Sequence, residues 1–276
     1  MVFEILVVDN ASPDRSVVDL KREFPDVQWV LLDENRGFGS ANNVAIEKAS
    51  GEFILLLNPD TELVMNAGEA FVHFMREPMN ADVAVCGAHL FTGTDKGTPS
   101  YGNFPSLLQS ISSCGFYLLY PNYYRQKLDT GVNNKMMHTR EVDFVSGAAM
   151  CIRKKILIHT GAFDTDFFLY FEETELCKRI RRAGHSIVLI PSIRILHHEG
   201  GSSSDQTFNA FGFYHFERSR RLYYRKVVGN WYVWLAAPFD FMGMLLKSLF
   251  GKESGNVWRK VKLFFGKYRH IDRSRR

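Results

Sequence analysis

The sequence Ile54-Leu55-Leu56-Leu57-Asn58-Pro59-Asp60 is the clearest local sign of the fold. Four apolar residues follow one another without alternation, which is typical of a strand buried on both faces of a parallel sheet. Pro59 ends the strand because it cannot donate to the ladder. Asp60 then stands just past the carboxyl end of the strand, where open α/β sheets bind their ligands. A carboxylate there suits a hard divalent cation, although Asn-Pro-Asp also suits a plain turn.

Strand and helix patterns alternate on the N-terminal side of this stretch. Apolar runs predict strands at residues 4–8 and 27–32, and helices are expected at 15–24 and from a glycine-bearing loop at 35–43 to about residue 49. Together with the strand before Asn58, this order is β-α-β-α-β. It predicts a parallel sheet joined by right-handed crossovers.

The alternation continues beyond Asp60 and is interrupted once. A helix is expected at 66–76, and strands at 84–87, within 142–153, at 187–191 and at 193–196. Between them, residues 92–140 are rich in Gly, Pro, Ser and Tyr and have no clear period. A long irregular insert in a compact domain is usually functional or mobile. We therefore expect either a segment that closes over a substrate or a hydrophobic flap.

A cluster of carboxylates opens a further predicted helix. Phe167–Phe171 is an apolar aromatic run, and Glu172, Glu173 and Glu175 follow it. The helix dipole favours acidic residues in a first turn, which accounts well for Glu175. It accounts less well for Glu172 and Glu173, which directly follow the apolar aromatic run. A carboxylate at the mouth of an apolar pocket can act as a general base. Gly184 is expected to end this helix.

Two other motifs are compatible with ligand binding. Gly37 and Gly39 precede a helix N-terminus, which favours anions, but a third glycine is lacking and a helix-start turn is the simpler interpretation. His197 stands at a strand end before His198 and two glycines. An imidazole in that position can join a carboxylate and a diphosphate on a metal ion.

Composition indicates a folded soluble protein whose basic and acidic residues are unevenly distributed along the chain. The chain has 276 residues, and its four cysteines form no Cys-x-x-Cys pair. Neither a zinc site nor a disulfide framework is predicted, and a reducing, cytoplasmic compartment is favoured. No signal peptide is recognised at the N-terminus. Residues 214–276 carry 15 Lys and Arg against 4 Asp and Glu, whereas the rest carries 19 against 26. A basic, aromatic tail of this kind is expected to face anions.

The tail leaves several interpretations open. Residues 231–250 are strongly apolar but contain Pro238, Asp240 and Lys247. A spanning helix needs about 20 residues with few charges, so an interfacial helix with an aromatic face and a basic rim fits better. A helix packed on the rest of the protein is a further alternative. Because no nucleic-acid-binding motif is recognised, we expect an anionic membrane surface as partner, at the cytoplasmic face, and no nucleic acid.

The ordered set of motifs resembles a known family. The set is Val8-Asp9-Asn10-Ala11-Ser12, Asn35-Arg36-Gly37-Phe38-Gly39, Asn58-Pro59-Asp60, Ser146-Gly147, Glu172-Glu173-Thr174-Glu175-Leu176-Cys177 and His197-His198. It resembles the inverting glycosyltransferases of family 2, which have the GT-A fold, a Rossmann-like, mainly parallel α/β sheet. Bacterial rhamnosyltransferase-like enzymes of surface-polysaccharide synthesis are particularly similar. The resemblance covers about residues 3–225, and we expect a GT-A domain at 1–213 and a helical tail at 214–276.

The resemblance implies a site and a reaction. It implies a UDP- or dTDP-linked sugar donor, a divalent cation (Mg²⁺ or Mn²⁺), and a glycan or lipid-linked acceptor. Glu173 would be the catalytic base that deprotonates the acceptor hydroxyl. The other implied positions are Asp9, Asn10, Arg36, Gly37, Asn58 and Asp60 for the nucleotide-sugar, Asp60 and His197 for the metal, and Ser146, Gly147 and Glu172 on the acceptor side.

The chain departs from the family pattern in two places. Glu173 replaces the usual Asp and is one methylene longer. The chain also starts at what would be the family's second strand, so we expect weak nucleotide binding. These departures motivate an alternative, a non-catalytic member that binds sugar-nucleotides or acts as a scaffold. A nucleotidyltransferase is a more distant third possibility, because no basic, glycine-rich loop for a triphosphate is present near the N-terminus.

Overall fold

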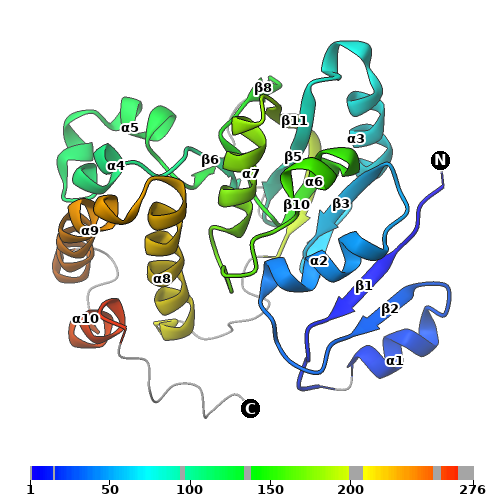
Figure 1. The fold of residues 1–276 in the computed structure, drawn as a ribbon, viewed down its shortest axis with the longest axis horizontal. Helices are drawn as coiled ribbons and strands as arrows, with labels where there is room; N and C mark the ends of the chain where they lie inside the picture. The colour runs from blue at the N-terminus through cyan, green and yellow to red at the C-terminus, as the bar shows by residue number, and fades with distance from the viewer. Residues whose placement is uncertain are drawn as a thin grey trace.

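A computed structural model describes residues 2–14, 16–93, 97–133, 138–198, 208–250 and 256–266. Figure 1 shows a sheet region with helices packed on it and a separate group of helices at one end of the molecule. The segments Glu199–Ser202 and 267–276, which belong to the predicted histidine motif and basic tail, lie outside the described residues.

The N-terminal region forms a small parallel sheet of its own. Strand β1 (Leu6–Asp9), helix α1 (Ser16–Glu23) and strand β2 (Gln28–Leu31) form a β-α-β unit, in which Val7 pairs with Trp29. Helix α2 (Phe38–Lys48) follows and packs against β1. These elements confirm the predicted order. Within the described residues, β1 and β2 form a two-stranded sheet that is not hydrogen-bonded to the larger sheet.

The main sheet has the strand order β3-β10-β5-β11-β4, with β8 pairing β11. Strand β10 runs antiparallel to both β3 and β5, whereas β5 and β11 are parallel. Three long strands, β3, β5 and β11, therefore share one direction, and the sheet is mixed but mainly parallel as expected. The bounds are β3 (Phe53–Leu57), β4 (Thr61–Glu62), β5 (Val83–Phe91), β8 (Arg140–Glu141), β10 (Ala149–Arg153) and β11 (Ser186–His197).

Two expectations about these strands were wrong in detail. Strand β3 is fully buried on one face only, because Ile54 and Leu56 are buried whereas Leu57 is exposed. Among the described residues its one hydrogen-bonded neighbour is β10, which is antiparallel, so β3 is an edge strand and not an inner strand of a parallel sheet. Residues 186–197 form one strand rather than two. Its pairing with β5 is irregular between Ile190 and Arg194, next to Pro191, which cannot donate to the ladder.

Each face of the main sheet has a hydrophobic core. One core contains Ile46 of α2, Ile156 of α6 and Leu176 of α7 against the sheet residues. The other contains Phe71 and Met75 of α3, which are almost completely buried. Burying this apolar surface is the main favourable contribution to folding. The helices are α3 (Ala67–Arg76), followed by the short 3-10 helix η1 (Pro78–Asn80), α6 (Lys154–Thr160) and α7 (Glu172–Arg182).

The insert at 92–140 is more regular than the sequence indicated. It contributes to a three-stranded sheet of order β7-β6-β9 and to helices that pack on the C-terminal region. Its short elements escaped prediction because each gains its stability from tertiary contacts rather than from a period of its own. They are β6 (Pro99–Gly102), α4 (Leu107–Ser112), η2 (Phe116–Leu119), α5 (Pro121–Lys127) and β7 (Val132–Asn133). Strand β9 (Phe144–Val145), which pairs with β6, follows the insert.

The C-terminal region is helical, as predicted. Helix α8 (Ala210–Val227) runs across the expected domain boundary at residue 213, and α9 (Asn230–Phe250) and α10 (Val257–Phe264) pack against it. Among the described residues, α9 alone is long and apolar enough to cross a membrane, a criterion that core helices also meet.

Candidate functional site

The residues after β3 meet the end of β11. Strand β4 follows Asp60 directly and pairs antiparallel with β11, so that Thr61 lies opposite His197. His197 Nε2 lies 3.3 Å from Asp60 Oδ1, and the amide of His198 donates a 2.8 Å hydrogen bond to the Asp60 carbonyl. Two segments more than a hundred residues apart are thus held side by side, which brings together Asp60 and His197, the two residues expected to hold a metal ion.

Three buried polar atoms at this junction have no hydrogen-bond partner. They are Asn58 Oδ1, Asp60 Oδ1, whose one polar contact among the described residues is His197 Nε2 at 3.3 Å, and His197 Nδ1 on the opposite side of the imidazole ring. Buried polar atoms normally find partners, and the carboxylate, amide and imidazole groups present here are groups that divalent cations accept. This donor set fits a divalent cation. Among the described residues, no group of three or more His, Cys, Asp and Glu side chains is arranged as a metal site, so the fit depends on Asn58 as the third group.

Asn10 ties the end of β1 to the glycine loop. Its Oδ1 accepts a 2.9 Å hydrogen bond from the amide of Arg36, and its Nδ2 donates to Asn35 Oδ1 and to the Gly37 carbonyl. Asp9 Oδ1 accepts a 3.0 Å hydrogen bond from the amide of Ser12. The predicted nucleotide-binding residues at 9–10 and 36–37 therefore form one loop cluster. Asn10 shapes this cluster with its whole amide group.

Position 37 requires a glycine because the backbone of Phe168 lies very close to it. Its φ is +85°, and a Cβ there would lie 2.2 Å from the carbonyl oxygen of Phe168. The same carbonyl accepts a 3.0 Å hydrogen bond from the amide of Phe38. The glycine loop is thus in contact with the aromatic run that leads into α7.

The carboxylates at the start of α7 follow a strained backbone. Tyr170 and Phe171 both have positive φ, 67° and 69°, a conformation that is uncommon for residues with a Cβ and is frequent at functional sites. Glu173 lines a small cavity of about 80 Å³ together with Tyr170, Phe171 and Phe216. Burial raises the pKa of Glu173 to about 7, despite backbone hydrogen bonds that favour its ionised form. A carboxyl with such a pKa suits proton transfer at neutral pH.

Glu172 is more deeply buried than its neighbour. It is 4% exposed, and its Oε2 has no hydrogen-bond partner. Burial, together with the nearby charge of Glu173, raises the pKa of Glu172 well above its ordinary value. Two neighbouring carboxyls in one apolar site do not both ionise readily. Each carboxyl therefore hinders the ionisation of the other.

The turn at 146–148 connects the two halves of the site. A Cβ on Gly147 would lie 3.2 Å from the ring of Phe38 and 3.8 Å from Glu173 Cβ. The carbonyl of the next residue, Ala148, accepts a 3.0 Å hydrogen bond from the amide of Asn58. Ser146 Oγ accepts from the amide of Ala148. The predicted acceptor-side residues at 146–147 therefore lie between Glu173 and the segment that carries Asp60.

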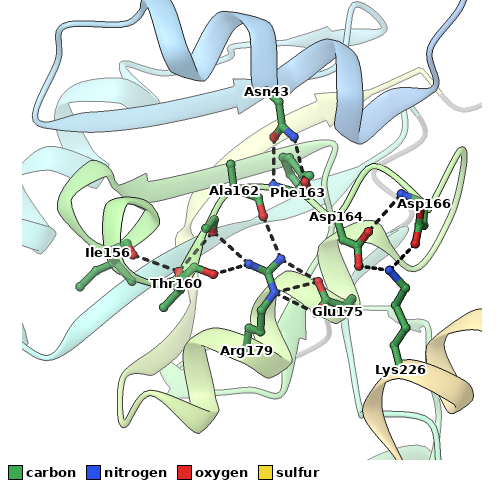
Figure 2. Close-up of polar contacts among 11 residues, drawn as sticks. Asn43, Ile156, Thr160, Ala162, Phe163, Asp164, Asp166, Glu175, Arg179 and Lys226 are labelled. Atoms are coloured by element: carbon green, nitrogen blue, oxygen red, sulfur yellow. Dashed lines mark hydrogen bonds and ion pairs between the residues drawn. The ribbon is translucent and has the colours of Figure 1, made fainter. Parts of the chain in front are cut away.

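Residues that the sequence did not single out hold the loop before α7. Figure 2 shows Arg179 donating to the carbonyls of Thr160 and Ala162 and binding the carboxylate of Glu175 through two nitrogens. Glu175 is thus the ion-pair partner of a structural arginine. The Glu175–Arg179 spacing of four residues within a helix is the signal that could have indicated this pair.

Two further side chains fix the same loop from other helices. Asn43 of α2 exchanges two hydrogen bonds with the backbone of Phe163, at 2.8 and 2.9 Å. Lys226 of α8 lies 2.5 Å from carboxylate oxygens of both Asp164 and Asp166 (Figure 2). Three helices therefore determine where the aromatic run begins and, through it, where Glu172 and Glu173 are placed.

The structure defines an α/β fold with polar residues gathered at the strand ends, and comparison of sequences gives the family. Residues 1–159 match the family described as Glycosyl transferase family 2, and the chain belongs to that family. Its membership confirms the resemblance drawn from the motifs.

Individual relatives are distant. The chain is 24% identical over 212 residues to the N-acetylglucosaminyl-diphospho-decaprenol L-rhamnosyltransferase of Mycobacterium tuberculosis strain CDC 1551, covering 72% of this chain and 67% of that protein. It is 25% identical over 203 residues to rhamnosyltransferase WbbL of Escherichia coli strain K12, covering 70% and 73%. The named relatives are rhamnosyltransferases, which agrees with the rhamnosyltransferase-like pattern of the motifs.

A solved structure shares the fold. The crystal structure of GalNAc-T7 with UDP, GalNAc and Mn²⁺ aligns with a TM-score of 0.57 and 14% identity, covering 98% of this chain and 50% of that one. The chain thus spans half the length of that structure. The architecture is that of the GT-A glycosyltransferases, with an added helical C-terminal region.

Proposed function

We propose that this protein is a metal-dependent, inverting glycosyltransferase of cell-surface polysaccharide synthesis. It transfers a sugar, rhamnose or another hexose, from a UDP- or dTDP-linked donor to a lipid-linked glycan. Family membership supports sugar transfer. The naming of one relative as an N-acetylglucosaminyl-diphospho-decaprenol L-rhamnosyltransferase supports the lipid-linked acceptor. Action at the cytoplasmic face of the membrane is part of the same proposal.

The observation that carries the proposal is the environment of Glu173. This carboxyl lines a cavity, has a pKa raised to about 7 by burial, and lies beside Gly147. Glu173 takes the proton from the acceptor hydroxyl as the oxygen attacks the anomeric carbon of the donor from the face opposite the leaving diphosphate. A single displacement inverts the configuration, so no enzyme nucleophile is needed.

The donor side is built from the two other clusters. Asp60, His197 and Asn58 would hold the divalent cation, which supplies positive charge to the departing nucleoside diphosphate. Asp9 accepts a hydrogen bond from the pyrimidine base. The loop that Asn10 holds at Arg36 and Gly37 lies along the nucleotide.

A thermal-shift titration tests the donor site. A ligand that binds only the native state raises the melting temperature by mass action. We expect UDP or dTDP to raise it in the presence of Mn²⁺, and the Asp60→Ala variant to lose the metal-dependent part. The matched control is Glu62→Ala, which removes an exposed carboxylate two residues away.

A second candidate function is non-catalytic sugar-nucleotide binding or scaffolding. It is favoured by the separation of the β1–β2 sheet from β3 within the described residues, which leaves the nucleotide cluster and the metal cluster on different sheets. No shift with either nucleotide would support the scaffold. A metal-dependent shift followed by sugar transfer, lost in Glu173→Gln, would exclude it.

A further inference from the structure

Helix α9 exposes its large apolar side chains and buries its acidic residue, which is the reverse of an ordinary surface helix. A surface helix normally buries its apolar stripe and exposes its polar residues. Here the acidic residue, Asp240, is 3% exposed and faces the protein. The outward stripe consists of large apolar side chains at helical spacing, namely Trp231, Trp234, Leu235, Met242 and Leu249, with Phe250 at the end.

Buried charges hold α9 in this orientation. Asp240 Oδ1 lies 3.3 Å from Arg220 of α8, which also pairs with Glu217 at 2.5 Å. On another part of the helix, Gly243 lets α4 approach so closely that a Cβ would lie 2.2 Å from Ser113 Oγ. Rotating α9 to hide its apolar stripe would expose or separate these partners. The outward apolar face is therefore a stable feature of the fold.

The charged side chains that α9 and α10 expose are all basic, within the described residues. Of the residues described between 208 and 266, the acidic ones are Glu217 and Asp240, and both are buried against Arg220. The exposed basic residues of α9 and α10 are Lys247, Arg259 and Lys262. Those of α8 face the other region of the protein: Arg218 and Arg225 line a pocket with Asp166, and Lys226 pairs with Asp164 and Asp166. Helix α10 repeats the combination on one face, with Trp258 and Phe265 exposed on either side of Lys262. The surface presented by α9 and α10 is thus aromatic and basic.

We propose that this surface, the outward faces of α9 and α10, docks on an anionic lipid bilayer with α9 lying in the plane of the interface. Aromatic side chains and lysines at the edge of an apolar face suit the headgroup region, and anionic lipids attract the basic rim. A second copy of the chain is disfavoured as occupant because it would bring one basic rim against another. The choice of a bilayer rests on the proposed function, in which the acceptor is lipid-linked.

The same contacts place α9 on the bilayer rather than across it. A spanning helix would carry Asp240 into hydrocarbon and separate it from Arg220, leaving the Asp240 carboxylate without its partner. Figure 1 shows α9 at the end of the molecule away from the main sheet, with α8 between them. In the proposed arrangement the membrane therefore lies at the end opposite the β1–β2 sheet.

Vesicle co-sedimentation tests the proposal without donor or acceptor. The parent protein is mixed with vesicles of phosphatidylcholine that contain either no or about a third phosphatidylglycerol. We expect it to pellet with the anionic vesicles and to be released by high salt. The variant Trp234→Ser/Phe250→Ser removes two side chains that are each 83% exposed and should weaken partitioning by about tenfold or more. The matched control, Met79→Ser/Ile158→Ser, removes exposed apolar side chains from η1 and α6 and should bind like the parent.

Further measurements separate the other outcomes. Thermal melts check that both double variants are folded. Extraction at high pH should release the parent from vesicles, whereas retention would show insertion across the bilayer. Equal binding of the parent and the Trp234→Ser/Phe250→Ser variant would overturn the proposal, as would a parent dimer that this variant converts to a monomer. Because no sugar or nucleotide is used, a failure here is distinct from a failure of sugar transfer.

Tryptophan fluorescence provides a depth measurement. Three of the four tryptophans, Trp231, Trp234 and Trp258, are exposed on this surface, and Trp29 lies in β2. Lipids brominated near the headgroup should quench the bound protein more than lipids brominated near the chain ends. Stronger quenching by the deep bromines would contradict the in-plane orientation.

Discussion

The amide of Phe38 donates a 3.0 Å hydrogen bond to the carbonyl of Phe168. This bond joins the glycine loop before α2 to the aromatic run before α7. It exists because Gly37 has no side chain. The donor and acceptor halves of the proposed site are therefore placed relative to each other by backbone contact.

Replacing Gly37 with alanine should disrupt this contact. The added Cβ would lie 2.2 Å from the Phe168 oxygen at a φ of +85°, so both a clash and backbone strain oppose it. We expect a loss of about 2–4 kcal/mol in the free energy of unfolding, measured by urea denaturation. Gly93→Ala is the control, since no atom lies within 4 Å of its added Cβ. A Gly37→Ala variant as stable as the parent would contradict this account of the loop.

Glu173→Gln should abolish most turnover while leaving donor binding intact. Glutamine keeps the shape of the side chain but cannot take the acceptor proton, and loss of a general base typically costs about 10²- to 10⁴-fold in rate. Sugar transfer and nucleotide affinity are measured separately on the same preparation. Glu47→Gln, on the exposed side of α2, should leave both unchanged. Turnover within about threefold of the parent in Glu173→Gln would assign the base to another group.

The rate should depend on pH through the ionisation of Glu173. The base works when ionised, and burial raises its pKa to about 7. We therefore expect kcat/KM to rise with pH, to be half-maximal at about pH 7 and to level off above about pH 8. A profile measured from pH 5.5 to 8.5 that is flat at its acidic end would mean that an ordinary, solvated carboxylate is the base.

The difference in stability between the Glu173→Gln variant and the parent should also depend on pH. In the folded state Glu173 keeps its proton up to about pH 7, whereas in the unfolded state it loses the proton near its ordinary pKa of 4.5. The folded state thus binds more protons between these values, so ionisation of Glu173 destabilises the fold as pH rises through this window. Glu173→Gln removes that effect. Its melting temperature should exceed that of the parent at pH 8, and the difference should vanish at about pH 4.

Arg179→Met should loosen the loop that carries the aromatic run. The substitution removes donors to Thr160 and Ala162 and leaves the carboxylate of Glu175 buried without its partner. Breaking a largely buried pair on one side costs about 3–5 kcal/mol. Urea unfolding measures the loss. The control is Arg76→Met, which removes an exposed ion pair with Glu52 and should cost under about 1 kcal/mol.

Much of the site could be predicted because its parts have local signatures. Asn58 and Asp60 follow an apolar run broken by Pro59, and Glu172 and Glu173 follow an aromatic run at a helix start. Each pattern indicates a strand end or a helix end, where parallel α/β sheets place ligand-binding residues. The roles of these residues in binding and catalysis stay predictions that the proposed variants test.

The contacts that hold the site could not be predicted in the same way. Arg179 reaches three backbone carbonyls in the loop at 160–162, and carbonyls leave no trace in a sequence. The two-residue strand β4 has no period of its own and forms because β11 runs past it. Nor does the sequence determine which side of α9 faces the protein, since that helix is apolar over most of its surface and the partner of Asp240 lies on another helix.

The pairing of β4 with β11 also bears on how the protein is made. Asp60 emerges from the ribosome early, whereas His197 follows more than a hundred residues later, and β11 must in addition align with β5 along its length. Contacts between segments so distant in sequence form slowly, because the loop between them must close first. A nascent chain that has not yet released β11 cannot assemble this junction. The junction between Asp60 and His197 is therefore completed only after most of the sheet has been synthesised.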